Sequence, residues 1–93
     1  MRLGTAGNTQ GPALEIIEKQ KGYTVLFDCS DDDESDYSQW IAIKDDHQFF
    51  AESAEALLGL ITLYEIFGND WNRHSNAKEL VEEIFSREVQ EYL

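Results

Sequence analysis

The sequence of 93 residues has little cysteine, little proline and few basic residues. Cys29 is the only cysteine, which excludes an internal disulfide. No apolar run approaches the roughly 20 residues that a membrane-spanning helix needs. The first eleven residues contain one Arg and no apolar stretch, so no signal peptide is expected. These absences predict a cytoplasmic protein without a membrane anchor.

The charge is strongly one-sided. The chain contains seven Lys and Arg residues and 19 Asp and Glu residues, which gives a formal net charge of -12 and a sequence pI near 4.2. Such a chain repels phosphate backbones and anionic lipid, so neither nucleic acid nor a membrane surface is an expected partner. The same field attracts a basic protein.

The apolar residues that are present are sufficient for one packed core. The hydrophobic fraction is 42%, with two Trp, four Tyr and five Phe, and a chain of this length forms a core without disulfides or metals. Residues 1–11 contain three Gly and no periodic pattern, which indicates a flexible N-terminal arm. Residues 12–93 are expected to form a single domain.

The first half of this domain reads as a short helix followed by three strands. Pro12 suits a helix start and Gly22 a helix end, which predicts a helix over 12–21. Strands are predicted at 23–29, 37–44 and 47–51, because these segments are rich in β-branched and aromatic residues. A turn at Asp45-Asp46 would pair Ile41 with Phe50 and Trp40 with Ala51.

The second half reads as two helices. Ser53 is a good N-cap, and the apolar segment that follows ends before Gly68. Because this helix has almost no polar face, it is expected to lie buried between the sheet and the C-terminal helix. Gly59 within it indicates a close backbone approach. The segment from Asn76 to the C-terminus carries one apolar stripe, which predicts an amphipathic surface helix.

The expected fold class is therefore α+β in the order α-β-β-β-α-α, with a three-stranded antiparallel meander and the helices packed mainly on one face. The first five elements resemble the double-stranded RNA-binding domains in their order. Those domains use basic residues on the helix after the sheet to contact phosphate. The corresponding helix here carries Glu55 and Glu65 and no Lys or Arg, so the RNA-binding function does not transfer.

The densest group of acids lies at residues 28–36, between the first two predicted strands. Clustered carboxylates suggest calcium, but the EF-hand spacing is not met, because Asp36 and Ala42 stand where the loop needs Gly and Glu. The segment is interpreted as a solvated hairpin tip, and no metal site is expected. Its acids remain candidates for contact with a basic partner: Asp31, Asp32, Asp33, Glu34 and Asp36.

No pattern of catalytic residues is present. The chain has no phosphate-binding loop, nucleophile elbow or dinucleotide fingerprint, so neither catalysis nor a cofactor is expected. Cys29 shares a face with Phe27 and is interpreted as a small core residue. Trp71 and Arg73 lie between the last two helices and are candidates for partner contact, although a Trp at such a place also packs back on the core.

The sequence thus favours a small, acidic, non-catalytic protein-interaction domain, in its sharpest form an immunity or inhibitor protein that binds a basic partner. A regulatory domain that binds a small ligand or a metal is the alternative. If the helices cover the face with Ile41, Ile43 and Phe50, the other face exposes Trp40 and Phe49, with Leu26 as a further candidate. That face would serve a partner protein or a homodimer.

Overall fold

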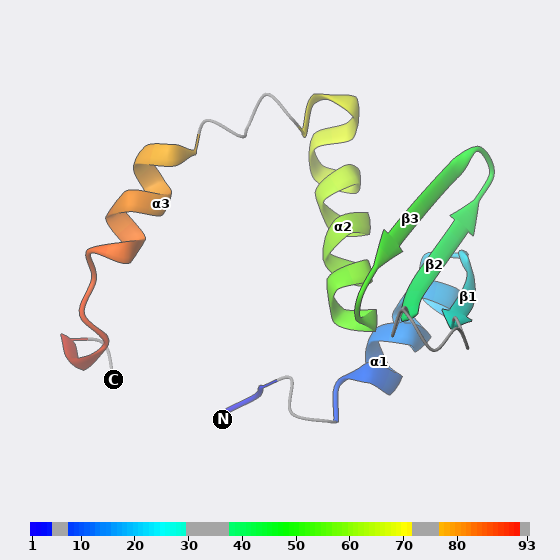
Figure 1. Cartoon of the computed structure of the whole chain (residues 1–93), viewed down its shortest axis with the longest axis horizontal. Helices are drawn as coiled ribbons and strands as arrows, with labels where there is room; N and C mark the ends of the chain where they lie inside the picture. The colour runs from blue at the N-terminus through cyan, green and yellow to red at the C-terminus, as the bar shows by residue number, and fades with distance from the viewer. Residues whose placement is uncertain (5–7, 30–37, 72–76, 92–93) are drawn as a thin grey trace.

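The computed structural model describes residues 1–4, 8–29, 38–71 and 77–91. The elements follow the predicted order (Figure 1). A helix, α1 (Gln10–Glu15), continues into a π-helical turn, η1 (Ile16–Gln20), and both precede the strands. The helix begins two residues before the predicted Pro12. Pro12 is tolerated there, since the first four amides of a helix have no intrahelical acceptor.

The sheet is an antiparallel meander in the order β1-β2-β3. Its strands are β1 (Thr24–Cys29), β2 (Ser38–Lys44) and β3 (His47–Ala51). The predicted register of the second hairpin is confirmed, with Ile41 opposite Phe50 and Trp40 opposite Ala51. Asp45 in the turn has a φ of 53°, a left-handed conformation that Asp tolerates better than most residues.

The helices cover one face of this sheet. The buried core contains Ile17 from η1, Ala42 from β2, and Leu57 and Ile61 from the long helix α2 (Ala54–Phe67), together with Tyr23. Val25, Trp40 and Phe49 pack partly buried against this core. The covered face is therefore the one with Trp40, Ala42 and Phe49, and the expectation that the helices cover Ile41, Ile43 and Phe50 is wrong.

Helix α2 begins and ends as predicted. The Ser53 hydroxyl accepts a hydrogen bond from the Ala56 amide at 3.0 Å, and Gly68 ends the helix with a φ of 60°. Only Ala54, Leu57 and Ile61 are buried, however, so α2 is enclosed on one side rather than on nearly all sides. A side chain at Gly59 would meet nothing within 4 Å, so the predicted close approach there is also wrong.

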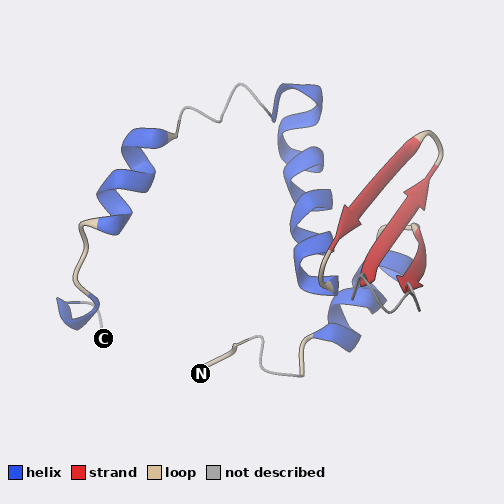
Figure 2. Ribbon diagram, in the orientation of Figure 1, coloured by secondary structure: helices blue, strands red, loops and turns tan. Residues whose placement is uncertain are grey.

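The last helix, α3 (Lys78–Phe85), is followed by a short 3-10 turn, η3 (Val89–Glu91). None of the residues of α3 is buried, and it stands away from α2 and the sheet (Figures 1 and 2). The expectation that it covers α2 is wrong for this reason. Within the described ranges, none of the helices has the length and apolarity to cross a membrane.

Candidate functional site

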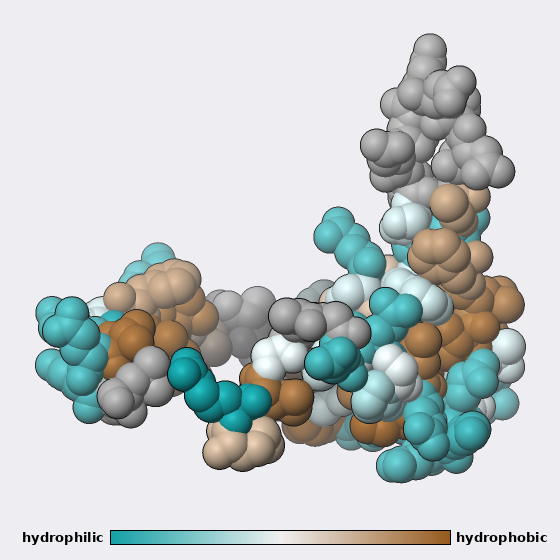
Figure 3. Space-filling model, turned by 90° about the horizontal axis from the view of Figure 1, so that it is seen from below, coloured by the Kyte–Doolittle hydropathy of each residue, from teal (hydrophilic) through white to brown (hydrophobic). Residues whose placement is uncertain are grey.

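One apolar surface lies on the face of the sheet that the helices leave uncovered. Leu26, Ile41 and Phe50 are direct neighbours across the three strands and form a row, the sheet row. Leu26 is 49% exposed and Phe50 is 48% exposed. Hydrophobic residues are visible at the surface at the sheet end of the molecule, on the right of Figure 3. Three large apolar side chains in contact across a sheet are normally covered by another layer.

Apart from Ile43, the described residues around the sheet row are polar or acidic. In the strand register, Asp28 and Gln39 flank it on one side, and on the other side Ile43 lies between its partners Thr24 and Gln48. The three strands contain a single Lys or Arg, Lys44. Its ammonium group donates to the Lys21 carbonyl at 2.8 Å and lies over the Tyr23 ring, on the side of the helices. Within the described strands, the uncovered face therefore has an apolar centre and a rim without Lys or Arg side chains.

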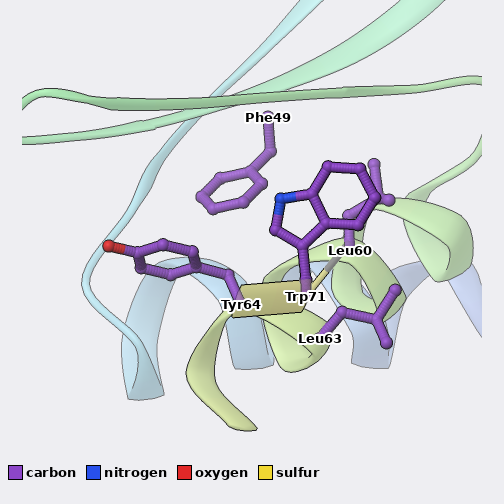
Figure 4. A pocket seen from close by; sticks show the side chains of 5 residues that line it. All are labelled: Phe49, Leu60, Leu63, Tyr64 and Trp71. Atoms are coloured by element: carbon purple, nitrogen blue, oxygen red, sulfur yellow. The ribbon is translucent and has the colours of Figure 1, made fainter. Parts of the chain in front are cut away.

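A second apolar surface is a hollow beside α2, which we call the α2 groove. Its lining comes from β3, α2 and the segment after α2, and five side chains converge on it (Figure 4): Phe49, Leu60, Leu63, Tyr64 and Trp71. The hollow has a volume of about 250 Å³. Trp71 is 58% exposed and Leu63 is 47% exposed, so the groove is open to solvent.

Polar groups gather near the β2–β3 turn and are paired with one another. The Lys21 ammonium group donates to the Glu65 carboxylate, at 2.8 Å for Oε2. The Tyr64 hydroxyl and His47 Nε2 lie 3.2 Å apart in a hydrogen bond. Burial of the Tyr23 hydroxyl, and then the nearby Glu65 carboxylate, raises the pKa of Tyr23 above its ordinary value of 10.0. These contacts hold α2 to η1 and β3.

Metal ligands are not brought together in the part of the chain that the structure describes. No group of three or more His, Cys, Asp or Glu side chains there is placed to hold a metal ion. Cys29 is exposed at the end of β1, so its interpretation as a core residue is wrong. An exposed thiol at the end of a strand does not contribute to the core.

The predicted partner-binding residues fall into three groups. Asp31, Asp32, Asp33, Glu34, Asp36 and Arg73 lie outside the described residues. Phe49 and Trp71 meet in the α2 groove. Trp40 packs against the core and contacts the Phe27 ring, with 4.7 Å between the ring centroids and an angle of 51° between the ring planes. Because Trp40 is a core contact, its replacement by Ala is expected to cost stability and is no clean test of binding.

The sequence analysis did not identify Phe50, Leu60 and Leu63 as candidate site residues, and it grouped Leu26 with Trp40 and Phe49, whereas Leu26 lies opposite Ile41. Each has the residue type and spacing of a core position, and the assignment to core or surface depends on where the helices pack. The alternation in β1 and β2 does separate the two faces, and a correct choice of the covered face would have found Leu26 and Phe50. Nothing in the local pattern of α2 distinguishes Leu60 from the buried Leu57.

Comparison of the chain with protein-family models, with curated proteins and with solved structures found no match. The geometry of the sheet row and of the α2 groove therefore carries the functional argument.

Proposed function

We propose that this protein acts by binding a basic protein partner in the cytoplasm, in the manner of an immunity or inhibitor protein, through the uncovered face of its sheet. The observation that carries the proposal is the sheet row, Leu26–Ile41–Phe50, which is half exposed at both ends and has no Lys or Arg among the described residues of its rim. An apolar centre within a polar rim is the usual anatomy of a protein interface.

The charge of the chain supports the choice of a basic partner. Its net charge of -12 attracts a basic protein over several ångströms and raises the rate of encounter. The apolar row then supplies the short-range contact, since burying apolar area stabilises a complex by roughly 25 cal/mol per Å² before the costs of association. A partner with a basic surface around an apolar or aromatic anchor fits both features.

The α2 groove supports the second candidate, a regulatory domain that binds a small apolar ligand. Its volume of about 250 Å³ is below the ~300–1,000 Å³ typical of small-molecule sites. Of its five lining residues, only Tyr64 and Trp71 offer a hydrogen-bonding group, and the Tyr64 hydroxyl already bonds His47. A ligand would thus have few polar contacts to orient it, and the sheet face is the stronger candidate.

A matched pair of aromatic residues tests the proposal. Phe50 and Phe27 are 48% and 53% exposed and lie on opposite faces of the same sheet. The immobilised chain retains its partner from a lysate at low salt, and calorimetry with the purified partner measures the affinity. We expect Phe50→Ala to weaken binding by roughly thirtyfold or more, the effect of a hot-spot residue, and Phe27→Ala to change it by less than about threefold.

Salt dependence is the second measurement. Binding of a basic partner to this acidic chain should weaken steeply as the salt concentration rises. Circular dichroism of both variants controls for folding. Equal losses in the two variants, or a partner that is acidic and bound equally at all salt concentrations, would contradict the proposal.

A further inference from the structure

Helix α3 packs on no surface in the part of the chain that the structure describes. Its apolar side chains form one stripe, and each is at least 44% exposed: Leu80, Val81, Ile84 and Phe85. Phe85 is 82% exposed. Isolated helices shorter than roughly 12–15 residues are marginal in water, and α3 has eight residues. A helix of this length with an apolar stripe needs a second surface for stability.

The α2 groove has the properties of that surface. Leu60, Leu63 and Ile66 follow one another along the outer side of α2 and are 39%, 47% and 67% exposed, and Trp71 extends them. A cavity of about 150 Å³ holds a benzene molecule, so the hollow of about 250 Å³ has room for the ring of Phe85. The lining of the groove contains no charged side chain.

We propose that the α2 groove receives α3 of a second copy, so that two copies exchange their C-terminal helices around a two-fold axis. Both halves of this contact, groove and helix, are present on each chain, which is the condition for a closed symmetric dimer. In the structure α3 stands away from α2 of its own chain (Figure 1). The leucines of the groove and the apolar residues of the stripe are exposed.

The area available is sufficient for a stable dimer. Each copy offers eight large, exposed apolar side chains for this contact, the four of the stripe and four on or next to the groove: Leu60, Leu63, Ile66 and Trp71. With about half of each side chain exposed, they offer on the order of 800 Å² per copy, the contribution of each partner to an interface of standard size. The contact is formed twice in the dimer, once around each groove.

The charge of the chain gives this dimer a distinctive salt dependence. Two copies each carry a net charge of -12 and repel one another. Added salt screens this repulsion, so self-association should become tighter as salt rises. Binding of a basic partner to the sheet row has the opposite dependence. The sign of the salt dependence therefore distinguishes the two proposals, and failure of one leaves the other unaffected.

Sedimentation velocity over a range of protein and salt concentrations tests the dimer. We expect the full chain to self-associate. Leu63→Ser in the groove and Phe85→Ser in the stripe should each raise the dissociation constant by roughly thirtyfold or more, as hot-spot residues do. Phe27→Ser, on the sheet and with a ring that is also exposed, at 53%, is the control and should leave it within about threefold.

Mixing the two disruptive variants distinguishes helix exchange from other contacts. The Leu63→Ser chain keeps an intact α3 and the Phe85→Ser chain keeps an intact groove, so a mixture forms one intact contact of the two. We expect heterodimers in the mixture at concentrations where each variant alone is a monomer. A wild-type chain that stays monomeric at all concentrations, a dimer that survives both substitutions, or a mixture without heterodimers overturns the proposal.

Discussion

Within α2, neighbouring leucines have different environments. Leu57 is fully buried in the core, whereas Leu60, one turn further along, is 39% exposed at the groove. Removal of a buried Leu side chain loses its transfer free energy and leaves a cavity, at a cost of ~2–5 kcal/mol. We expect Leu57→Ala to lower the free energy of unfolding by that amount and Leu60→Ala to lower it by about 1 kcal/mol or less.

Urea denaturation at a concentration where the chain is monomeric measures this difference. Ile61→Ala is a further test, since Ile61 is as buried as Leu57. Similar losses at Leu57 and Leu60 would mean that the outer side of α2 is covered in the monomer, contrary to the structure.

Tyr23 gives the fold a dependence on alkaline pH. Burial, and then the nearby Glu65 carboxylate, raises the pKa of Tyr23 above 10.0 in the folded state. The neutral phenol is the form favoured by folding, so its contribution to stability is complete below pH 10. That contribution is lost as the pH rises through the raised pKa, because the unfolded chain then releases the proton more readily.

The substitution Tyr23→Phe removes the ionisable hydroxyl group and keeps the aromatic ring. We expect the free energy of unfolding of the wild-type chain to fall above pH 10 more steeply than that of Tyr23→Phe. Thermal melts from pH 8 to pH 11 compare the two chains. Tyr64 is half-buried, and its hydroxyl is hydrogen-bonded to His47. Tyr64→Phe is therefore the control for the general effect of removing a tyrosine hydroxyl. Parallel pH profiles for the wild-type chain and Tyr23→Phe would contradict the assignment.

At the scale of elements, the patterns that repeat within a few residues were predictable. The N-cap at Ser53, the end of α2 at Gly68 and the turn at Asp45-Asp46 all depend on local chemistry, and the structure places each where it was predicted. The register of β2 and β3 followed from the turn length. These features need no knowledge of the tertiary arrangement.

The packing of elements on one another was not predictable. A helix as apolar as α2 reads as enclosed on all sides, and Gly59 then indicates a neighbouring backbone. In the described part of the chain no other helix covers the apolar outer side of α2, because α3 does not lie on it. An apolar residue has the same local pattern in a core and in an interface, so the sequence cannot separate Leu57 from Leu60.

Helix α3 should also differ from α2 in its protection from hydrogen exchange. In dilute monomer its amides are held only by an eight-residue helix without buried residues, and they should exchange within about tenfold of the unfolded rate. The amides of α2 around the buried Leu57 and Ile61 should exchange only on global unfolding. Exchange followed by mass spectrometry resolves the two helices. Strong protection of α3 in a chain shown to be monomeric would mean that α3 packs on its own chain.

At the scale of the whole molecule, charge and exposed apolar surface oppose one another. The chain exposes apolar residues on the sheet, on α2 and on α3, which favours association of any kind. A net charge of -12 limits this association by mutual repulsion. Selective binding then depends on a partner that supplies positive charge, or on a contact extensive enough to overcome the repulsion.

The uncovered sheet face has a consequence for the solubility of the protein in acid. Near the sequence pI of 4.2 the net charge of the chain approaches zero, so electrostatic repulsion no longer keeps the molecules apart. The sheet ends at β1 and β3, and β1 carries the segment Thr-Val-Leu-Phe, with Leu26 and Phe27 both exposed. Edge strands of this composition form backbone hydrogen bonds with edge strands of other molecules when the repulsion is removed. The protein should therefore precipitate as β-rich aggregates in mildly acidic solution while its monomer is still folded, and the acidic side chains act as its colloidal protection.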